Sequence, residues 1–336
     1  PYPLSSFERV GPWKPTESMD ENIIWGVTML ERVTTLFRSR DFILFLGLAL
    51  GLFFDRGAEW TRPLVLPALG WVMTLSVMGI SGRTLKAPGA MLFQAVIGTA
   101  ISYGVLSTAI LAMAALLLND DTLWSGFVIV AAVPPAVAVI PFADFLKGDR
   151  VYALFGTTGA YLAGLFLMPL IAFFFLETDI AEPLSILIVI LELIVGPFML
   201  SRVLILTRLE EKITPFKGSM TNWSFFLVVY TMVGLNQEHF VKDPVGLLPV
   251  VLIAACSTFL MGFVLEKFCE IFKVGTAVTK SIVLLGTLKN YGMAAGISLA
   301  LFGRKTALPA TVSTIFMIIY IIWLNYRTKK GVPHFP

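Results

Sequence analysis

Long apolar segments recur along almost the whole chain, and they constrain its fold more than any other feature. A helix needs about 20 apolar residues to cross a bilayer. Ten segments that approach this length can be drawn: 42–54, 63–81, 90–118, 122–146, 151–176, 184–206, 219–236, 246–268, 276–302 and 307–326. Charged residues make up only 14% of the chain, against about 25% in soluble domains. The sequence therefore predicts an all-α polytopic membrane protein with ten transmembrane helices.

Basic residues in the loops predict how the chain is oriented. With the N-terminus placed in the cytoplasm, the segments on that side hold 19 Lys and Arg residues and the outer loops hold five. Such an excess is typical of cytoplasmic loops. We therefore expect a multi-pass protein of the plasma (inner) membrane with both termini cytoplasmic.

Three regions follow from this orientation. Residues 1–40 form a cytoplasmic or interfacial segment, 41–326 the ten-helix unit, and 327–336 a cytoplasmic tail. Apolar residues between 22 and 37 share one helical face, which indicates an amphipathic helix. This helix either lies on the membrane surface or packs on the next span.

The fourth and ninth segments each contain three residues of types that interrupt helices. The fourth segment contains three prolines, Pro134, Pro135 and Pro141. The ninth contains three glycines, Gly286, Gly292 and Gly296. An even span count also divides into two inverted repeats of five helices, in which the fourth and ninth segments are counterparts. Broken helices at matching places indicate a binding site at the membrane midplane, although simple proline kinks are the alternative.

Lys289 is the most unusual residue of the ninth segment. It lies near the centre of an apolar run and is followed by Asn290. A free ammonium group in hydrocarbon costs roughly 2.5–3.5 kcal/mol even on the insertion scale. An intramembrane charge of this kind is a functional-site hypothesis by default.

Four stretches together resemble the bile acid:sodium symporter superfamily. They are RPLVLPALGWVMTLSVMGIS (62–81), VPPAVAVIPFADFLKGDRVYAL (133–154), ELIVGPFMLSRVL (192–204) and LKNYGMAAGISLALFG (288–303). They occur in the family's order, and the similarity covers nearly the whole chain after residue 40. The chain therefore resembles a divergent member of this superfamily.

The resemblance implies a fold and a function. Spans 3–5 and 8–10 would form a core in which the broken fourth and ninth helices cross. Spans 1, 2, 6 and 7 would form a panel facing it, with the substrate bound between the two. The chain would be a secondary transporter of a small or amphipathic organic anion that works by alternating access, and not an enzyme.

The chain departs from the family where sodium is bound. Two side-chain ligands are missing from the fourth span, where Val139 and Ile140 stand in place of Ser-Asn. In the ninth span Leu285 replaces Glu and Lys289 replaces Gln, whereas Asn290 and Gly292 match the family. In the fifth span Thr157 and Thr158 lie close to positions that usually carry hydroxyls.

These departures suggest that Lys289 permanently replaces a bound sodium ion. The C-terminal ends of half-helices direct carbonyls and partial negative charge towards a crossover, and an ammonium has three donors for them. If the amine remains charged, the carrier could work as a facilitator, or the amine could attract the anionic substrate. An amine that exchanges its proton could instead link transport to protons. The structural alternative is that Lys289 only neutralises a buried carboxylate, with Asp144 and Glu192 as candidates.

Other classes of protein fit the sequence less well. A sodium-coupled symporter with an altered site and a cation/proton antiporter-like carrier remain alternatives, as does a membrane scaffold or sensor. The only histidines, His239 and His334, lie in a loop and in the tail, which excludes a histidine-rich metalloenzyme. We expect no cofactor beyond a coupling sodium ion or proton, no bound metal cluster and no nucleic-acid partner. The sequence leaves the oligomeric state open.

Overall fold

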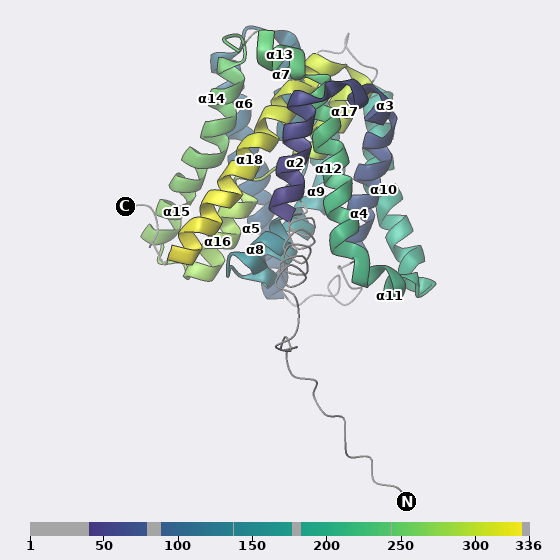
Figure 1. Cartoon of the computed structure of the whole chain (residues 1–336). Coiled ribbons are helices and arrows are strands. Elements are labelled where there is room, and N and C mark those ends of the chain that lie inside the picture. Colours follow the sequence, from purple (N-terminus) through teal and green to yellow (C-terminus); the bar gives the residue numbers. More distant parts are fainter. Residues whose placement is uncertain (1–39, 79–88, 137, 177–182, 243, 331–336) are drawn as a thin grey trace, which may run out of the picture.

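The computed structural model describes residues 40–78, 89–136, 138–176, 183–242 and 244–330 (Figure 1). Over these residues the chain is built of helices, and its one β-type pairing is an isolated bridge between Pro135 and Lys289. The amphipathic helix expected between residues 22 and 37 lies outside the described residues.

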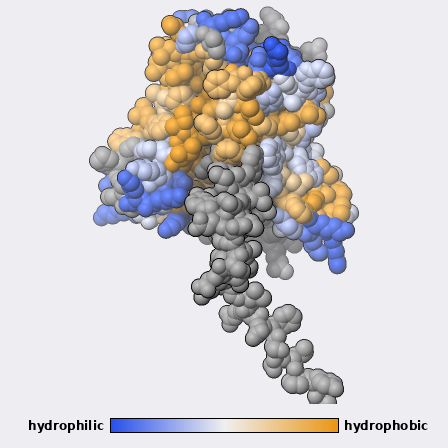
Figure 2. Space-filling view, viewed as in Figure 1, coloured by the Kyte–Doolittle hydropathy of each residue, from blue (hydrophilic) through white to orange (hydrophobic). Residues whose placement is uncertain are grey.

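Several helices have the length and composition of membrane spans. Among the described residues, four helical stretches are long and apolar enough to cross a membrane: Met91–Leu117, Arg150–Phe175, Leu248–Ile271 and Arg304–Lys330. Five shorter apolar helices accompany them. Figure 2 shows a broad apolar band between hydrophilic ends of the molecule. The prediction of an all-α membrane protein is therefore confirmed.

The first half of the chain contains the following elements. They are α2 (Arg40–Phe53), η1 (Asp55–Gly57), α3 (Ala58–Thr61), η2 (Arg62–Leu64), α4 (Val65–Met78), α5 (Gly89–Thr99), η4 (Ala100–Ser107), α6 (Thr108–Leu117), α7 (Asp121–Ala132), α8 (Val139–Phe145) and α9 (Arg150–Phe175). Helices α5, η4 and α6 form one continuous helical stretch, whereas an extended segment separates α7 from α8.

The second half repeats this order of continuous and interrupted helices. Its elements are α10 (Pro183–Leu206), α11 (Leu209–Ile213), η5 (Thr214–Phe216), α12 (Lys217–Leu235), α13 (Gln237–Lys242), α14 (Leu248–Ala255), η6 (Cys256–Leu260), α15 (Met261–Ile271), α16 (Thr276–Leu285), α17 (Tyr291–Leu301) and α18 (Arg304–Lys330). Helix α18 continues to Lys330, four residues past the expected end of the last span.

Two of the continuous stretches contain a π-helical segment that the sequence does not predict. Both η4 and η6 have π geometry, and they occupy the expected third and eighth spans. A π segment shifts the direction of the following side chains and is frequent at functional sites. Segment η4 matters below because it carries Tyr103.

The helices pack in two groups. Helices α2, α4, α10 and α12 contact one another on one side of the molecule (Figure 1). Helices α5, α7, α9 and α14 to α18 contact one another on the other side, with α8 against α9 and α16. Helix α17 lies between the groups, because it packs on α18 and α7 and also on α4, α10 and α12.

Glycines allow the closest approaches within the second group. A Cβ atom on Gly98 of α5 would overlap the backbone of Gly156 in α9, and one on Gly126 of α7 would overlap the Thr306 carbonyl of α18. Small residues at such contacts are typical of membrane helices, whose association depends on close packing.

Ion pairs join the helix ends on the upper side of Figure 1. Asp120 caps α7 by accepting hydrogen bonds from the Thr122 and Leu123 amides, both at 3.0 Å, and it also pairs with Lys305. Burial opposes ionisation of Asp120, but the hydrogen bonds from Lys305 and Leu123 hold the pKa of this carboxyl below its ordinary value. Glu59 belongs to α3, which packs on α12 of the first group. It pairs with Arg304 at the start of α18, so this pair links the two groups of helices.

Candidate functional site

The first interruption lies between α7 and α8, and prolines cause it. Helix α7 ends at Ala132, and Val133 adopts an extended conformation (φ −65°, ψ 150°). A residue before proline is disfavoured in the α region, and proline lacks the amide that would continue the helix. Pro134 and Pro135 therefore stop α7 in the buried interior of the protein.

The second interruption lies between α16 and α17, and no proline causes it. Helix α16 ends at Leu285 and α17 begins at Tyr291. The Asn290 side chain accepts a hydrogen bond from the Met293 amide at 3.1 Å and so caps α17. Asparagine is among the best N-cap residues, and Asn290 therefore defines where the new helix starts.

The two interrupted segments cross and pair with each other. The Ala136 amide donates to the Leu288 carbonyl at 3.1 Å, and the Asn290 amide donates to the Pro134 carbonyl at 2.9 Å. These bonds make an antiparallel bridge centred on Pro135 and Lys289. Unwound backbone within a membrane must find such partners inside the protein, because lipid offers none.

Lys289 is fully buried at this crossing. Its Nζ donates to the Val133 carbonyl at 3.0 Å and lies 4.2 Å from the centre of the Tyr103 ring. Val133 is the C-cap of α7, where carbonyls lack helical partners and the helix dipole is negative. An ammonium in this position would supply positive charge where a half-helix ends.

Of the two carboxylates proposed as partners of Lys289, Asp144 does not account for its burial. Among the ion pairs of the described residues, none includes Lys289. Asp144 lies 3.7 Å from Arg150, and its side chain is 63% exposed. Glu192 belongs to α10, and its side chain lies outside the described part of the chain. Neutralisation of Asp144 is therefore not the reason why Lys289 is buried.

Asn290 connects three helices. Besides capping α17, its Nδ2 donates to the Tyr161 hydroxyl of α9 at 3.0 Å and lies 3.5 Å from the Met73 sulfur of α4. Met73 belongs to the first group of helices and Tyr161 to the second. Asn290 thus lies at the contact between the groups as well as at the crossing.

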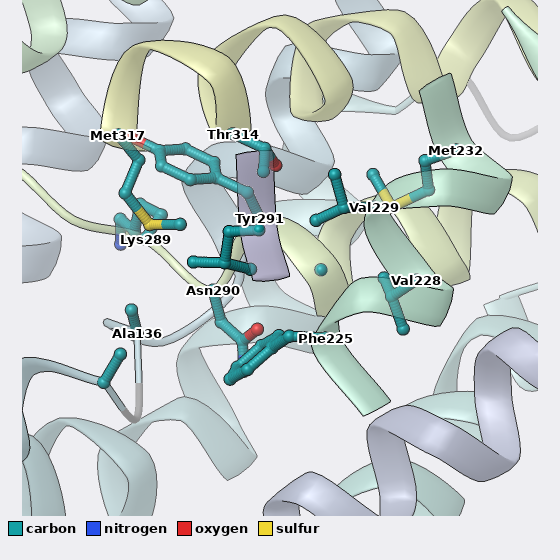
Figure 3. A pocket seen from close by; sticks show the side chains of 13 residues that line it. Ala136, Phe225, Val228, Val229, Met232, Lys289, Asn290, Tyr291, Thr314 and Met317 are labelled. Carbon is teal, nitrogen blue, oxygen red and sulfur yellow. The ribbon is translucent and has the colours of Figure 1, made fainter. Parts of the chain in front are cut away.

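A small pocket borders the crossing on one side (Figure 3). Its lining comes from α2, α12, α18 and both interrupted segments: Leu44, Ala136, Ala138, Phe225, Val228, Val229, Met232, Lys289, Asn290, Tyr291, Gly292, Thr314 and Met317. The interior volume is about 30 Å³. Since a water molecule needs about 10–15 Å³ on this measure, the pocket in this conformation has room for about two.

The partners of the Lys289 nitrogen lie outside the pocket. Its partners, Val133 and Tyr103, are absent from the pocket lining, and Figure 3 shows the nitrogen directed away from Val229 and Met232 across the pocket. Lys289 therefore lines the pocket, whereas the two partners of its nitrogen come from the end of α7 and from η4.

The structure brings together only part of the predicted site. Five predicted residues meet at the crossing or the pocket: Pro134, Pro135, Lys289, Asn290 and Gly292. Thr157 and Thr158 are buried in α9, and their hydroxyls have no hydrogen-bond partner among the described residues. Pro141 and Asp144 are exposed residues of α8.

Sequence reasoning missed Tyr103, Tyr161 and the Val133 carbonyl. Tyr103 follows Ser102 within the third span, and this pair of polar residues was the available signal. A backbone carbonyl has no such signal, because its role depends on where the helix stops.

A model of the SBF-like CPA transporter family matches residues 66–324. The chain belongs to this family. The resemblance to the bile acid:sodium symporter superfamily is thereby confirmed, and the match includes both interrupted helices. No curated protein matches the chain.

Membership of the SBF-like CPA transporter family identifies a multi-pass membrane protein that acts in transport, and it fits the expectation that the chain is not an enzyme. In this transporter, the crossing described above lies well inside the matched region.

Proposed function

We propose that this transporter carries a small or amphipathic organic anion by alternating access and without classical sodium coupling. The observation that carries the proposal is the position of Lys289. Its ammonium is buried at the crossing of two interrupted helices and bonds to the carbonyl at which α7 ends. A cation that belongs to the protein would stabilise the negative end of the half-helix there, as a bound metal ion would otherwise do.

The chemistry of the crossing supports this reading. Sodium, like other hard cations, prefers oxygen ligands. Leu285, Val139 and Ile140 stand where the resemblance implies ligand side chains, and none of them carries an oxygen there. The role of an internal cation therefore suits Lys289 better than direct attraction of the substrate, since its charge points away from the pocket.

The lining of the pocket suits an anionic substrate, although the pocket must widen from its present volume of about 30 Å³ to admit one. Gly292 lies at the second position of α17 and lines the pocket. An amide in the first turn of a helix has no intrahelical acceptor, and the N-terminal end of the helix favours negative charge. Phe225, Met232 and Met317 supply apolar surface for the rest of an amphipathic molecule.

Matching features in the two halves support ten spans arranged as two inverted repeats. The sequence α7, break, α8, α9 has its counterpart in α16, break, α17, α18, and the π segments η4 and η6 precede the two breaks. We accordingly propose that α2, α4, α10 and α12 form the panel and that the second group forms the core. The excess of basic residues supports an inner-membrane location with cytoplasmic termini.

Ligand-induced thermal stabilisation tests the substrate class and the coupling together. The purified protein is heated with a panel of organic anions, with sodium or with potassium at equal ionic strength, and across pH. We expect at least one anion to raise the melting temperature equally in both salts. A pH-dependent effect would assign proton linkage, and stabilisation by cations or neutral solutes alone would contradict the proposal.

Alternating access also predicts that the Glu59–Arg304 pair restrains the pocket on its own side of the membrane. The pair joins the proposed panel to the proposed core, whereas the neighbouring Lys305–Asp120 pair lies within the core. Exposed ion pairs contribute about 0.2–1 kcal/mol. Glu59→Gln should therefore raise the access rate from that side by a factor of about 1.4 to 5.

A cysteine in place of Thr314, in a chain without Cys256 and Cys269, reports this access. A membrane-impermeant thiol reagent is applied from the side of Glu59, and the rate of modification is measured. Lys305→Gln is the matched control and should leave the rate unchanged. Equal rates of cysteine modification with Glu59→Gln and with Glu59 retained would show that the ion pair does not restrain access to the pocket.

A further inference from the structure

Lys289 has two partners, and one of them is the face of an aromatic ring. The Nζ lies 4.2 Å from the centre of the Tyr103 ring, and both side chains are buried, at 0% and 7% exposure. The attraction between a cation and an aromatic face is strongest where water is excluded. The ring is therefore a suitable uncharged counterpart for an ammonium that has no carboxylate partner among the described residues.

The fold leaves space for the Tyr103 side chain but gives its hydroxyl no hydrogen-bond partner among the described residues. Tyr103 lies in the π-helical segment η4, and the space around its hydroxyl is kept open by Gly164 of α9. A Cβ atom at Gly164 would lie 2.7 Å from that hydroxyl and 3.7 Å from the Pro134 side chain. The hydroxyl itself has no hydrogen-bond partner among the described residues. A buried, unpaired hydroxyl is unfavourable, so the ring and not the hydroxyl makes the favourable contact of Tyr103.

We propose that the Tyr103 ring face and the Val133 carbonyl form an ammonium-binding site, and that Tyr103 is the residue that positions Lys289. The same site takes a free primary alkylammonium ion when the lysine side chain is removed. This inference deepens the proposed function, because it names the groups that hold the internal cation. Its test measures stability and not transport, so either proposal can fail alone.

Rescue of a truncated lysine by n-propylammonium tests the site. Thermal unfolding of purified Lys289→Ala is measured with n-propylammonium chloride, with sodium chloride at equal ionic strength, and with 1-propanol as the neutral analogue. We expect a saturable rise of about 2–4 °C with n-propylammonium alone. The unchanged protein, whose site already holds Lys289, should show no rise.

Second substitutions at Tyr103 separate the ring from the hydroxyl. Rescue of Lys289→Ala should persist with Tyr103→Phe, which keeps the ring face, and disappear with Tyr103→Leu, which removes it. Loss of rescue with both, persistence with both, or no rescue of Lys289→Ala itself would overturn the proposal.

Substitutions in the presence of Lys289 keep the test decisive if Lys289→Ala does not fold. Tyr103→Phe should then unfold at the temperature of the unchanged chain, and Tyr103→Leu at a lower one. Tyr161→Phe is the matched control, because the Tyr161 hydroxyl accepts a hydrogen bond from Asn290 and its loss should lower the melting temperature. A decrease for Tyr103→Phe as large as that for Tyr161→Phe would assign the role to the hydroxyl and overturn the inference.

Discussion

Replacing Lys289 by glutamine is expected to leave the chain folded and to abolish anion uptake or make it depend on an added cation. Glutamine retains a donor for the Val133 carbonyl and removes the cost of burying a charge, which on the insertion scale is about 2.5–3.5 kcal/mol. The change also removes the positive charge at the end of α7. The melting temperature should therefore change little, whereas the crossing should lose the positive charge that Lys289 supplies.

Uptake into proteoliposomes, with and without sodium and across pH, measures this effect alongside thermal unfolding. Lys280→Gln is the matched control, because Lys280 also donates to a backbone carbonyl, that of Leu146 at 2.8 Å, but lies away from the crossing on α16. Lys280→Gln should take up the anion at the same rate as the unchanged protein. Uptake and a pH profile that are unaltered by Lys289→Gln would count against the internal-cation role.

Replacing Gly98 by alanine is expected to destabilise the protein strongly. The new Cβ would overlap the backbone of Gly156, and a backbone cannot move aside as a side chain can. Helices α5 and α9 must then separate. Overpacking in a close-packed interior typically costs about 1–3 kcal/mol and occasionally more.

Thermal unfolding in detergent measures the cost. Gly104→Ala is the matched control in the same continuous helical stretch, because a Cβ there would meet no atom within 4 Å. It should be neutral or slightly stabilising, since alanine has the better helix propensity. Equal melting temperatures for the two variants would show that the α5–α9 contact is not as close as described.

The sequence predicted the class of fold and the main interruptions because both depend on local chemistry. Consecutive prolines cannot continue a helix, so the break at Pro134 and Pro135 could be anticipated, as could the charge at Lys289. The residue at which α17 begins was harder to predict. Asn290 caps this helix only because the chain is already broken before it.

The remaining parts of the site depend on tertiary packing. No pattern along the chain predicts the π-helical geometry of η4, which brings the Tyr103 ring to Lys289. The sequence also could not show that Asp144 pairs with Arg150 near the surface, because an acidic residue close to a break can point either way. Pairings between residues far apart in the chain require the folded arrangement of the helices.

The effect of sodium on the thermal stability of the unchanged protein tests the internal-cation role of Lys289 most directly. The purified protein is heated in sodium, potassium or choline chloride at equal ionic strength, without any substrate. A ligand that binds only the folded state raises the melting temperature as its concentration increases. We predict the same melting temperature in all three salts, because Lys289 already occupies the position; a saturable rise that is specific to sodium would contradict the account.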